Sequence, residues 1–372
     1  MNATNPIQSV KVFGAGSIGN HMSHAASTLG WRVDLCDISE AALQRARDDI
    51  YPGRYGAWNE SIGLHLVGDA PCGEHDLIII GTPPDHHMDL AIAALADNPK
   101  AILIEKPLCG PRLERAQELH DAVAGTDIRV FVGYDHVVGN AAEDAATTAG
   151  NGQIGAIETL DVEFREHWSG IFAAHPWLDG PADTYLGYWQ RGGGASGEHS
   201  HATNLWQAFA HAIGAGRVVR VSAVMDYVTN GPATYDKLCL MTLETETGMI
   251  GRVVQDVVTN PPCKWARLQG VEGYVEWHCG FEPGCDAVIV QQDGAAAERR
   301  RTEKTRPDDF IRELRHIEDV LARDIDSPIS LERGLDTMLV IAAAHESART
   351  GQTVQIDPAA GYTLSALTTA HR

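Results

Sequence analysis

The chain has 372 residues, of which 44% are hydrophobic, and its 50 acidic against 29 basic side chains give a formal net charge of -21. A single hydrophobic core rarely serves so long a chain, so two domains are expected. A negative field of this size disfavours nucleic acids and anionic membrane surfaces as partners.

Targeting signals are not evident in the sequence. No apolar run approaches the ~20 residues that cross a bilayer, and the opening stretch MNATNPIQSV has no basic flank followed by an apolar segment. We therefore expect no membrane span, no signal peptide and a cytoplasmic location. The seven scattered cysteines indicate reduced thiols rather than a disulfide framework.

Strand and helix patterns alternate through the first 134 residues. Short apolar runs next to turn residues predict strands, and stretches of helical composition between them predict helices. The predicted strands are 9–16, 32–37, 76–82, 101–107 and 128–134, and the predicted helices are 17–30, 39–50, 87–98 and 113–125. Such alternation builds a doubly wound parallel sheet that binds ligands at the carboxyl ends of its strands.

A glycine-rich turn follows the first predicted strand. Gly14, Gly16 and Gly19 form G-x-G-x-x-G, in which the glycines permit the turn, the approach of a pyrophosphate and close helix packing. Ser17 and Ile18 stand at the helix start, where backbone N–H groups bind phosphate. The pattern predicts a Rossmann dinucleotide-binding domain, and a glycine-rich turn without a ligand is the alternative.

Asp37 ends the second predicted strand, close to the ~20-residue distance from the glycines expected of a carboxylate that binds the adenosine ribose. A carboxylate repels the 2′-phosphate of NADP, and no arginine follows it directly. NAD is therefore favoured over NADP as the cofactor. The alternative for Asp37 is an N-cap of the helix that begins near Ser39.

The strand over residues 101–107 ends on Glu105, Lys106 and Pro107. A strand end places the ammonium group on a rigid element at the ligand crevice, and the proline fixes the exit of the chain. The alternative is an ordinary surface ion pair, which contributes about 0–1 kcal/mol. The position at the crevice favours a functional lysine.

The segment over residues 190–214 carries three glycines and then a predicted helix with several polar side chains. Glu198, His201 and Asn204 recur every third residue, so a continuous helix presents them on one face, while His199 points elsewhere. An imidazole exchanges protons near neutral pH, so a histidine of this segment could act as a general base, and a structural histidine is the alternative. H-x-H on a helix sends its two rings to different faces, so no metal is expected.

Aromatic residues are concentrated in residues 168–206. They are Trp168, Phe172, Trp177, Tyr185, Tyr188, Trp189 and Trp206. Amphipathic rings suit the apolar face of a sugar or cyclitol, and Trp168 is a candidate substrate contact on this ground. A loop that buries its own aromatics, or an oligomer interface, explains them equally well.

Later segments predict a second domain. Alternating β-branched residues over 218–229, 237–248, 249–260 and 272–279 indicate a large, mostly antiparallel sheet, open on one face. The charged segment 294–309 predicts a solvated loop before a helix. The expected fold class is α/β, with a Rossmann domain over 1–134, an α+β substrate and oligomerisation domain over 135–330, and a C-terminal helix and tail over 331–372 that pack back on the chain.

Several motifs together resemble the Gfo/Idh/MocA family of glucose-fructose oxidoreductases and inositol dehydrogenases. They are GAGSIG, DLIIIGTPPDHHMDLAIAAL and AILIEKPL, with similar passages around residues 131–168 and 333–356. The resemblance implies that Lys106 reaches the substrate and the nicotinamide, with Glu105 pairing with or orienting the cation. It implies that His201 is the general base and that Glu198 orients its ring or binds a substrate hydroxyl. Asn204 stands where the family usually has aspartate, which leaves the role of that carboxylate open.

Two further comparisons with the family concern a loop next to the cofactor and the lining of the substrate pocket. Thr82, Pro83 and His87 match a cofactor-side loop of the family, and packing at a helix N-terminus is the alternative for His87. Many members carry an arginine a few residues past the glycine that corresponds to Gly133. This chain instead has Tyr134, an aspartate and His136 after that glycine. An anionic handle on the substrate is therefore disfavoured, and Tyr134 and His136 are candidates to line the pocket.

These patterns predict an NAD-dependent oxidoreductase that transfers a hydride between nicotinamide and a secondary alcohol or ketone of a sugar, sugar derivative or cyclitol. A redox-neutral lyase or glycosidase that retains NAD, and a non-enzymatic NAD-sensing regulator, are the alternatives. The expected partners are a polyol or sugar-like small molecule and further copies of the chain. The resemblance implies a homodimer or homotetramer formed through the C-terminal sheet.

Overall fold

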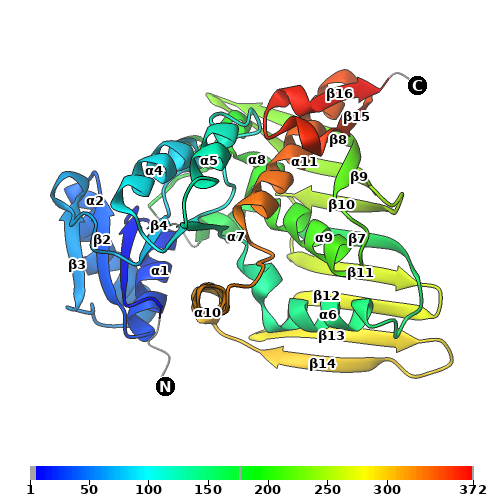
Figure 1. The fold of residues 1–372 in the computed structure, drawn as a ribbon, viewed down its shortest axis with the longest axis horizontal. Coiled ribbons are helices and arrows are strands. Elements are labelled where there is room, and N and C mark those ends of the chain that lie inside the picture. Colours follow the sequence, from blue (N-terminus) through cyan, green and yellow to red (C-terminus); the bar gives the residue numbers. More distant parts are fainter. Residues whose placement is uncertain (1–5, 174, 176, 371–372) are drawn as a thin grey trace.

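The computed structural model describes residues 6–173, 175 and 177–370. It contains two sheets that lie side by side, each with its own covering helices (Figure 1). The first sheet has six strands and the second has ten. No helix in the described part of the chain is long and apolar enough to cross a membrane.

The first sheet is parallel throughout and has the strand order β3-β2-β1-β4-β5-β6. Its strands are β1 (Ser9–Phe13), β2 (Arg32–Asp37), β3 (Ile62–Leu66), β4 (Leu77–Ile80), β5 (Ala101–Ile104) and β6 (Arg129–Val132). Every residue of β4 and β5 is buried, as expected of parallel strands covered by helices on both faces. The order reverses between β1 and β4, which places the ligand crevice at their carboxyl ends.

One strand of this sheet was not predicted. β3 reads IGLHL, and among its residues Ile62 alone is buried, so the strand lacks the apolar run that marked its neighbours. Edge strands need little apolar surface because one side has no strand neighbour.

Helices connect these strands. They are α1 (Ser17–Thr28), α2 (Glu40–Arg45), α3 (Tyr51–Tyr55), α4 (His87–Ala94) and α5 (Ala116–Val123). α2 begins where Ser39 Oγ accepts a hydrogen bond from the backbone N–H of Ala42, and a π-helical turn over Ala46–Ile50 joins it to α3.

The second sheet is mostly antiparallel, as predicted. Its order is β14-β13-β12-β11-β7-β10-β9-β8-β15-β16, with β7 and β10 paired in parallel. The strands are β7 (Ile157–Arg165), β8 (Val218–Asn230), β9 (Ala233–Thr245), β10 (Ile250–Asp256), β11 (Cys263–Gly270), β12 (Gly273–Glu282), β13 (Cys285–Gln292), β14 (Glu298–Glu303), β15 (Thr353–Ile356) and β16 (Leu367–Ala370).

Helices α6 (Asn140–Gly150), α9 (Ser200–Ala212) and α11 (Leu331–Thr350) pack on one face of this sheet (Figure 1). The remaining helices of this region are α7 (Trp168–Ala173), α8 (Gly194–Glu198) and α10 (Asp308–Arg323), and α10 packs against α1. On β9, buried Cys239 and Met241 face the helices, while Leu240 between them is 44% exposed. The opposite face is therefore open.

The prediction of a loop over residues 294–309 was wrong. Residues 298–303 form β14, which pairs antiparallel with β13. The segment is rich in arginine and glutamate because β14 is an edge strand, where charged side chains reach water from both faces and discourage pairing with other chains.

The two sheets are joined where α11 begins. The backbone N–H of Val132 on β6 donates to the carbonyl of Ile329 at 2.8 Å, and Phe131 forms an antiparallel bridge with Ser330. Gly334 then lies against Val132, because a Cβ added to this glycine would stand 2.4 Å from Val132 Cγ2. The absence of a side chain at Gly334 lets α11 approach the edge of the first sheet.

Gly334→Ala is therefore expected to lower the free energy of unfolding by about 1–3 kcal/mol, since the added methyl overpacks this contact. Urea denaturation of the purified variant measures the loss. Val132→Ala in the same chain should recover part of it, because it removes the atoms that the methyl meets. Equal stability of Gly334→Ala and the parent would contradict the packing.

Candidate active site

The glycine-rich turn between β1 and α1 has the shape of a phosphate cradle. Gly14 has a φ of +97°, and a Cβ there would lie 2.6 Å from the carbonyl oxygen of Gly81 on the neighbouring connection. A Cβ on Gly19 would lie 1.8 Å from the carbonyl oxygen of Gly14. A Cβ on Gly16 would meet no heavy atom within 4 Å. Two glycines thus allow close packing, and the third leaves open space at the start of α1.

The N-terminus of α1 has no side-chain cap, so its first N–H groups remain directed at this space. Arg54 of α3 lies beside them. Its guanidinium donates to the carbonyl oxygen of Ser17 at 2.9 Å and to Ser17 Oγ at 2.8 Å. Sequence spacing gave no signal for Arg54, because it comes from a separate helix. Its positive charge suits a pyrophosphate.

Asp37 lies at the carboxyl end of β2, next to the same turn. Its carboxylate accepts hydrogen bonds from the backbone N–H groups of Ala15 and Ser39, both at 2.8 Å. The cap of α2 is Ser39 itself, so the predicted alternative role of Asp37 as that cap is wrong. The two backbone contacts fix the carboxylate at the crevice, where a ribose would lie. Ile38, directly after it, is 88% exposed.

The Thr82 loop follows β4. Thr82 Oγ1 is buried without a hydrogen-bond partner among the described residues, and Pro83 is exposed. His87 is fully buried, with Nε2 2.7 Å from the carbonyl oxygen of Thr82 and Nδ1 3.1 Å from that of Pro107. Burial lowers the pKa of His87 to about 4. The buried imidazole therefore contacts the backbone of two crevice loops.

Lys106 follows β5 and reaches across to the second sheet's helices. Its Nζ donates to Glu198 Oε2 at 3.1 Å and to the Glu198 carbonyl oxygen at 3.0 Å. Burial alone would raise the pKa of Glu198, but the nearby positive charges, led by Lys106, lower it overall. The carboxylate is therefore ionised, and the pair holds the end of β5 against the end of α8.

The predicted pairing of Lys106 with Glu105 is not what the structure contains. Glu105 is 6% exposed, and its Oε1 has no hydrogen-bond partner among the described residues. Burial, and then the charge of Asp135, raise the pKa of Glu105 to about 8. Gly133 makes room for this carboxyl group, because a Cβ there would lie 2.8 Å from Glu105 Oε2.

The single helix predicted over Glu198, His201 and Asn204 was also wrong. α8 ends at Glu198 and α9 begins at Ser200, with His199 between them at φ -95° and ψ 26°. The i, i+3 spacing argument fails for Glu198, which ends α8, whereas His201 and Asn204 share α9. Glu198 turns to Lys106 from the end of α8, and His201 lies in the first turn of α9.

His201 lies in a buried cluster. Its Nδ1 is 3.7 Å from Asp135 Oδ1, and its ring is 4.7 Å from that of His136 and 5.6 Å from that of Tyr134, between centroids. Burial, and then His136, lower the pKa of His201 well below its ordinary value. The imidazole is therefore neutral at neutral pH and can accept a proton. The carboxylate of Asp135 beside it comes from a distant segment, so helical spacing did not indicate it.

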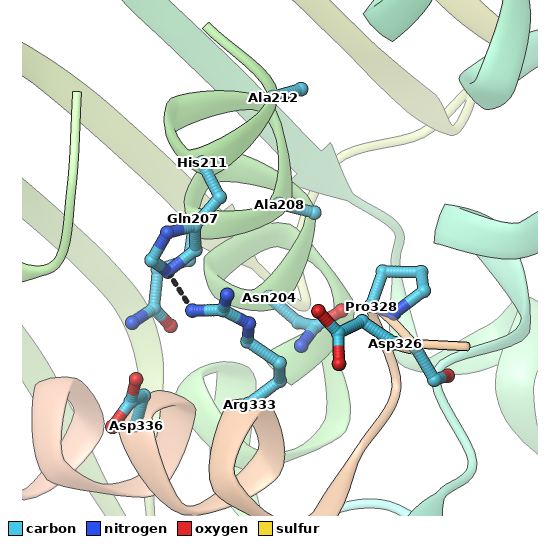
Figure 2. Close-up of a pocket in the computed structure, with 10 residues that line it drawn as sticks. Asn204, Gln207, Ala208, His211, Ala212, Asp326, Pro328, Arg333 and Asp336 are labelled. Carbon is cyan, nitrogen blue, oxygen red and sulfur yellow. Dashed lines mark hydrogen bonds between the residues drawn. The ribbon is translucent and has the colours of Figure 1, made fainter. Parts of the chain in front are cut away.

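Asn204 follows His201 by three residues in α9 and contacts α11. Its Nδ2 donates to Thr337 Oγ1 on α11 at 3.2 Å, and its side chain lines a cavity of about 310 Å³ that also contains His211 and Arg333 (Figure 2). The predicted substrate contact of Asn204 stays a prediction.

Trp168, in contrast, begins α7 and packs on Tyr235 and Phe172, each with 5.5 Å between ring centroids. It contacts a small apolar cluster with Ala195 of α8 and Val257. The indole Nε1 is buried without a partner among the described residues. Much of the ring is therefore used in packing that supports α8.

Two further residues lie near the site, of which the sequence indicated only Tyr185, as one of the aromatic residues over 168–206. The phenol of Tyr185 is buried, and burial, followed by the charge of Glu198, raises its pKa well above the ordinary value. Lys264 on β11 pairs with Glu166 at 2.8 Å and is among the charges that lower the pKa of His201. Neither residue belongs to a motif, so only the folded chain brings them to the site.

Residues 9–134 match the family model described as an oxidoreductase family with an NAD-binding Rossmann fold, Gfo/Idh/MocA. The N-terminal domain belongs to the Gfo/Idh/MocA oxidoreductase family. The resemblance seen in the sequence is thereby confirmed for this domain, and with it the NAD-binding fold. A comparison with curated proteins finds no match.

Solved structures match nearly the whole chain in fold. Levoglucosan dehydrogenase in complex with NADH and levoglucosan aligns with a TM-score of 0.75 and 19% identity, over 94% of this chain and 99% of that one. A putative myo-inositol dehydrogenase from Sinorhizobium meliloti 1021 gives 0.71 and 20%, over 94% and 100%. An oxidoreductase from Agrobacterium radiobacter in complex with NAD+, L-tartaric acid and magnesium gives 0.73 and 19%, over 95% and 98%. The two-sheet fold is therefore shared with these structures at low identity.

Gly16→Ala is expected to weaken NAD binding by at least about tenfold, or about 1.4 kcal/mol, because the methyl occupies the open cradle. Isothermal titration calorimetry measures the affinity, and urea denaturation without NAD should give unchanged stability. Gly53→Ala in α3 is the matched control, since a Cβ there also meets no heavy atom within 4 Å. Equal NAD affinity of the parent and Gly16→Ala would place the dinucleotide elsewhere.

Proposed function

We propose that the protein is an NAD-dependent dehydrogenase or reductase that transfers a hydride between nicotinamide and a secondary alcohol or ketone of a sugar, sugar derivative or cyclitol. The observation that carries the proposal is the contact of Lys106 with Glu198 at the carboxyl end of β5. The contact joins a cation at the end of a strand of the first sheet to a carboxylate at the end of α8, which packs on the second sheet. Both groups lie at the crevice of an NAD-binding domain.

The residues around the glycine turn fit NAD. The open space at Gly16, the uncapped start of α1 and the guanidinium of Arg54 suit the pyrophosphate, and the fixed carboxylate of Asp37 suits the ribose hydroxyls. Bound NAD would supply the hydride acceptor. The buried Thr82 Oγ1 and the Glu105–Lys106 strand end would line the nicotinamide side of the crevice.

Lys106 and Glu198 bind the reacting part of the substrate in this proposal. An ammonium group has three donors, and two of those of Lys106 contact Glu198. The third is left for the oxygen of the reacting alcohol. Glu198, ionised and 18% exposed in its side chain, accepts a hydrogen bond from a neighbouring hydroxyl. Paired hydroxyls of a polyol match this arrangement.

Oxidation of an alcohol also releases a proton, and His201 takes it. Its imidazole is neutral because burial lowers its pKa. The Asp135 carboxylate, 3.7 Å from Nδ1, stabilises the positive charge that develops on the ring. Tyr134 and His136 fix the ring from its edges. In the reverse direction, the same imidazolium returns the proton to the alkoxide.

The polyol class follows from chemistry and is supported by the neighbours in fold. Levoglucosan dehydrogenase was solved with levoglucosan, and a second neighbour is described as a putative myo-inositol dehydrogenase. Both compounds are neutral and rich in hydroxyls. The site of this chain likewise has hydrogen-bonding groups, and the opposite charges of Lys106 and Glu198 balance each other.

Purified protein is expected to produce NADH from NAD with one group of neutral sugars or cyclitols, detected by absorbance in the NADH band. Lys106→Met and His201→Gln should each lower kcat/KM by about 10²–10⁴-fold, because each removes a group that acts on the reacting alcohol. His211→Gln, on the cavity side of α9, is the matched histidine control and should keep the rate of the parent.

Full activity of both variants would contradict the assignment of these roles. Tight NAD binding without NADH formation across neutral sugars, sugar acids, nucleotide sugars and inositols would contradict net oxidation. That result would favour the redox-neutral or NAD-sensing alternatives.

We also infer that copies of the chain associate through the open face of the second sheet. Val224 on β8 is 70% exposed and pairs directly with Leu240 on β9, which is 44% exposed. Adjacent apolar side chains on an uncovered sheet suit a self-complementary interface.

Leu240→Arg is expected to shift the protein toward monomer in sedimentation velocity, because a charge would then be buried in the interface. Val271→Arg is the matched control, since Val271 is also exposed but lies in the β11–β12 turn. A monomeric parent protein would exclude the interface.

A further inference from the structure

The cluster around His201 contains buried polar atoms that have no partner. Asp135 Oδ1 and His201 Nδ1 both lack a hydrogen-bond partner among the described residues, although they lie 3.7 Å apart. The Asp135 side chain is 8% exposed and that of His201 is 13% exposed. Buried acceptors and donors without partners carry a desolvation cost, which indicates that something binds between them.

His136 completes the cluster. One ligand atom from each of Asp135, His136 and His201 can be chosen so that all three lie within 4.8 Å of one another. The two imidazole planes stand at 78°, with 4.7 Å between centroids. Metal–nitrogen and metal–oxygen bonds are about 2.0–2.2 Å, so ligands of one tetrahedral ion lie on the order of 3.5 Å apart. Small side-chain adjustments bring the three atoms to that spacing.

We propose that Asp135, His136 and His201 bind a divalent transition-metal ion, Zn²⁺ by its ligand preference, and that this ion withdraws His201 from proton transfer. Two imidazoles and one carboxylate are a ligand set that suits Zn²⁺ and leaves a fourth position open. The binding rests on the geometry alone, whereas the loss of activity also rests on the proposed function. An imidazole whose Nδ1 binds a metal keeps a proton on Nε2 and has no lone pair for another.

The charges around the cluster are compatible with a cation. Lys106, Lys264, Lys304 and Arg306 lie near the two histidines, and each of the three lysines forms an ion pair with a carboxylate of its own. In contrast, Glu105 Oε1 and both oxygens of Glu313 are buried without partners among the described residues, and both groups interact electrostatically with Asp135. Burial raises the pKa of both carboxyl groups, and a divalent cation beside them would favour their ionised form.

Co²⁺ is the probe for binding. Protein freed of metal with a chelator, then freed of the chelator, should bind one equivalent of Co²⁺ with the visible absorption of a low-coordinate nitrogen and oxygen site, and Zn²⁺ should displace it. Asp135→Asn, His136→Gln and His201→Gln should each weaken Co²⁺ binding more than about tenfold. Far-UV circular dichroism and NAD binding verify that each variant is folded.

His65→Gln and His75→Gln are the matched controls, because His65 and His75 each contact Asp34 through Nε2 at 2.8 Å in a second histidine–carboxylate group. Both controls should bind Co²⁺ as the parent does. Absence of Co²⁺ binding in the parent, or equal binding in the three cluster variants, would overturn the site and favour a histidine–carboxylate pair bridged by water.

The consequence for catalysis is tested separately. One equivalent of Zn²⁺ should abolish NADH formation by the parent, and a chelator should restore it. Activation by Zn²⁺ would overturn the inhibitory role and make the ion a Lewis acid for the substrate oxygen. Co²⁺ binding in a protein that never forms NADH would uphold the site, and it would refute the inhibitory role together with the proposed function.

Discussion

The contact between Lys106 and Glu198 is the interaction on which the site depends, because it is made across two independently formed sheets. Lys106 is held at the end of a fully buried strand, and Glu198 at the end of a short helix over the second sheet. Each side chain is less than a fifth exposed, so neither charge is well solvated without the other. The relative position of the sheets therefore sets the distance between two proposed substrate-binding groups.

Several supports keep that distance fixed. Ile329, just before α11, accepts a hydrogen bond from β6, and Gly334 of α11 packs against β6. These contacts hold the second sheet's helices against the first sheet. Ser196 of α8 donates its backbone N–H to Asp236 on β9 at 2.7 Å, and its Oγ lies 3.1 Å from Nε2 of His345 on α11. α8 is thus held from two sides. A low-identity relative can keep this construction while changing the pocket, because the supports lie outside the crevice.

The sequence predicted the parts of the site whose signals are local. The turn at Gly14, Gly16 and Gly19 and the strand that ends at Lys106 follow from apolar runs and glycine spacing within a few residues. The partners of these groups could not be predicted in the same way. Arg54 meets Ser17, and Asp135 meets His201, through folding of distant segments. The error over Glu198 arose because periodicity assumes an unbroken helix, and no proline marks the break at His199.

The break at His199 also gives Lys106 and His201 different electrostatic surroundings. The peptide dipoles of α9 point their positive end at its first turn, where His201 lies, and this end opposes a positive charge on the imidazole. The last carbonyl groups of α8 present the opposite sign, and one of them, from Glu198, accepts the ammonium of Lys106. A continuous helix would have placed both groups in its interior, away from either pole. Two helix ends meeting at one residue therefore give the lysine a site that favours its charge and give the histidine a site that favours its neutral form.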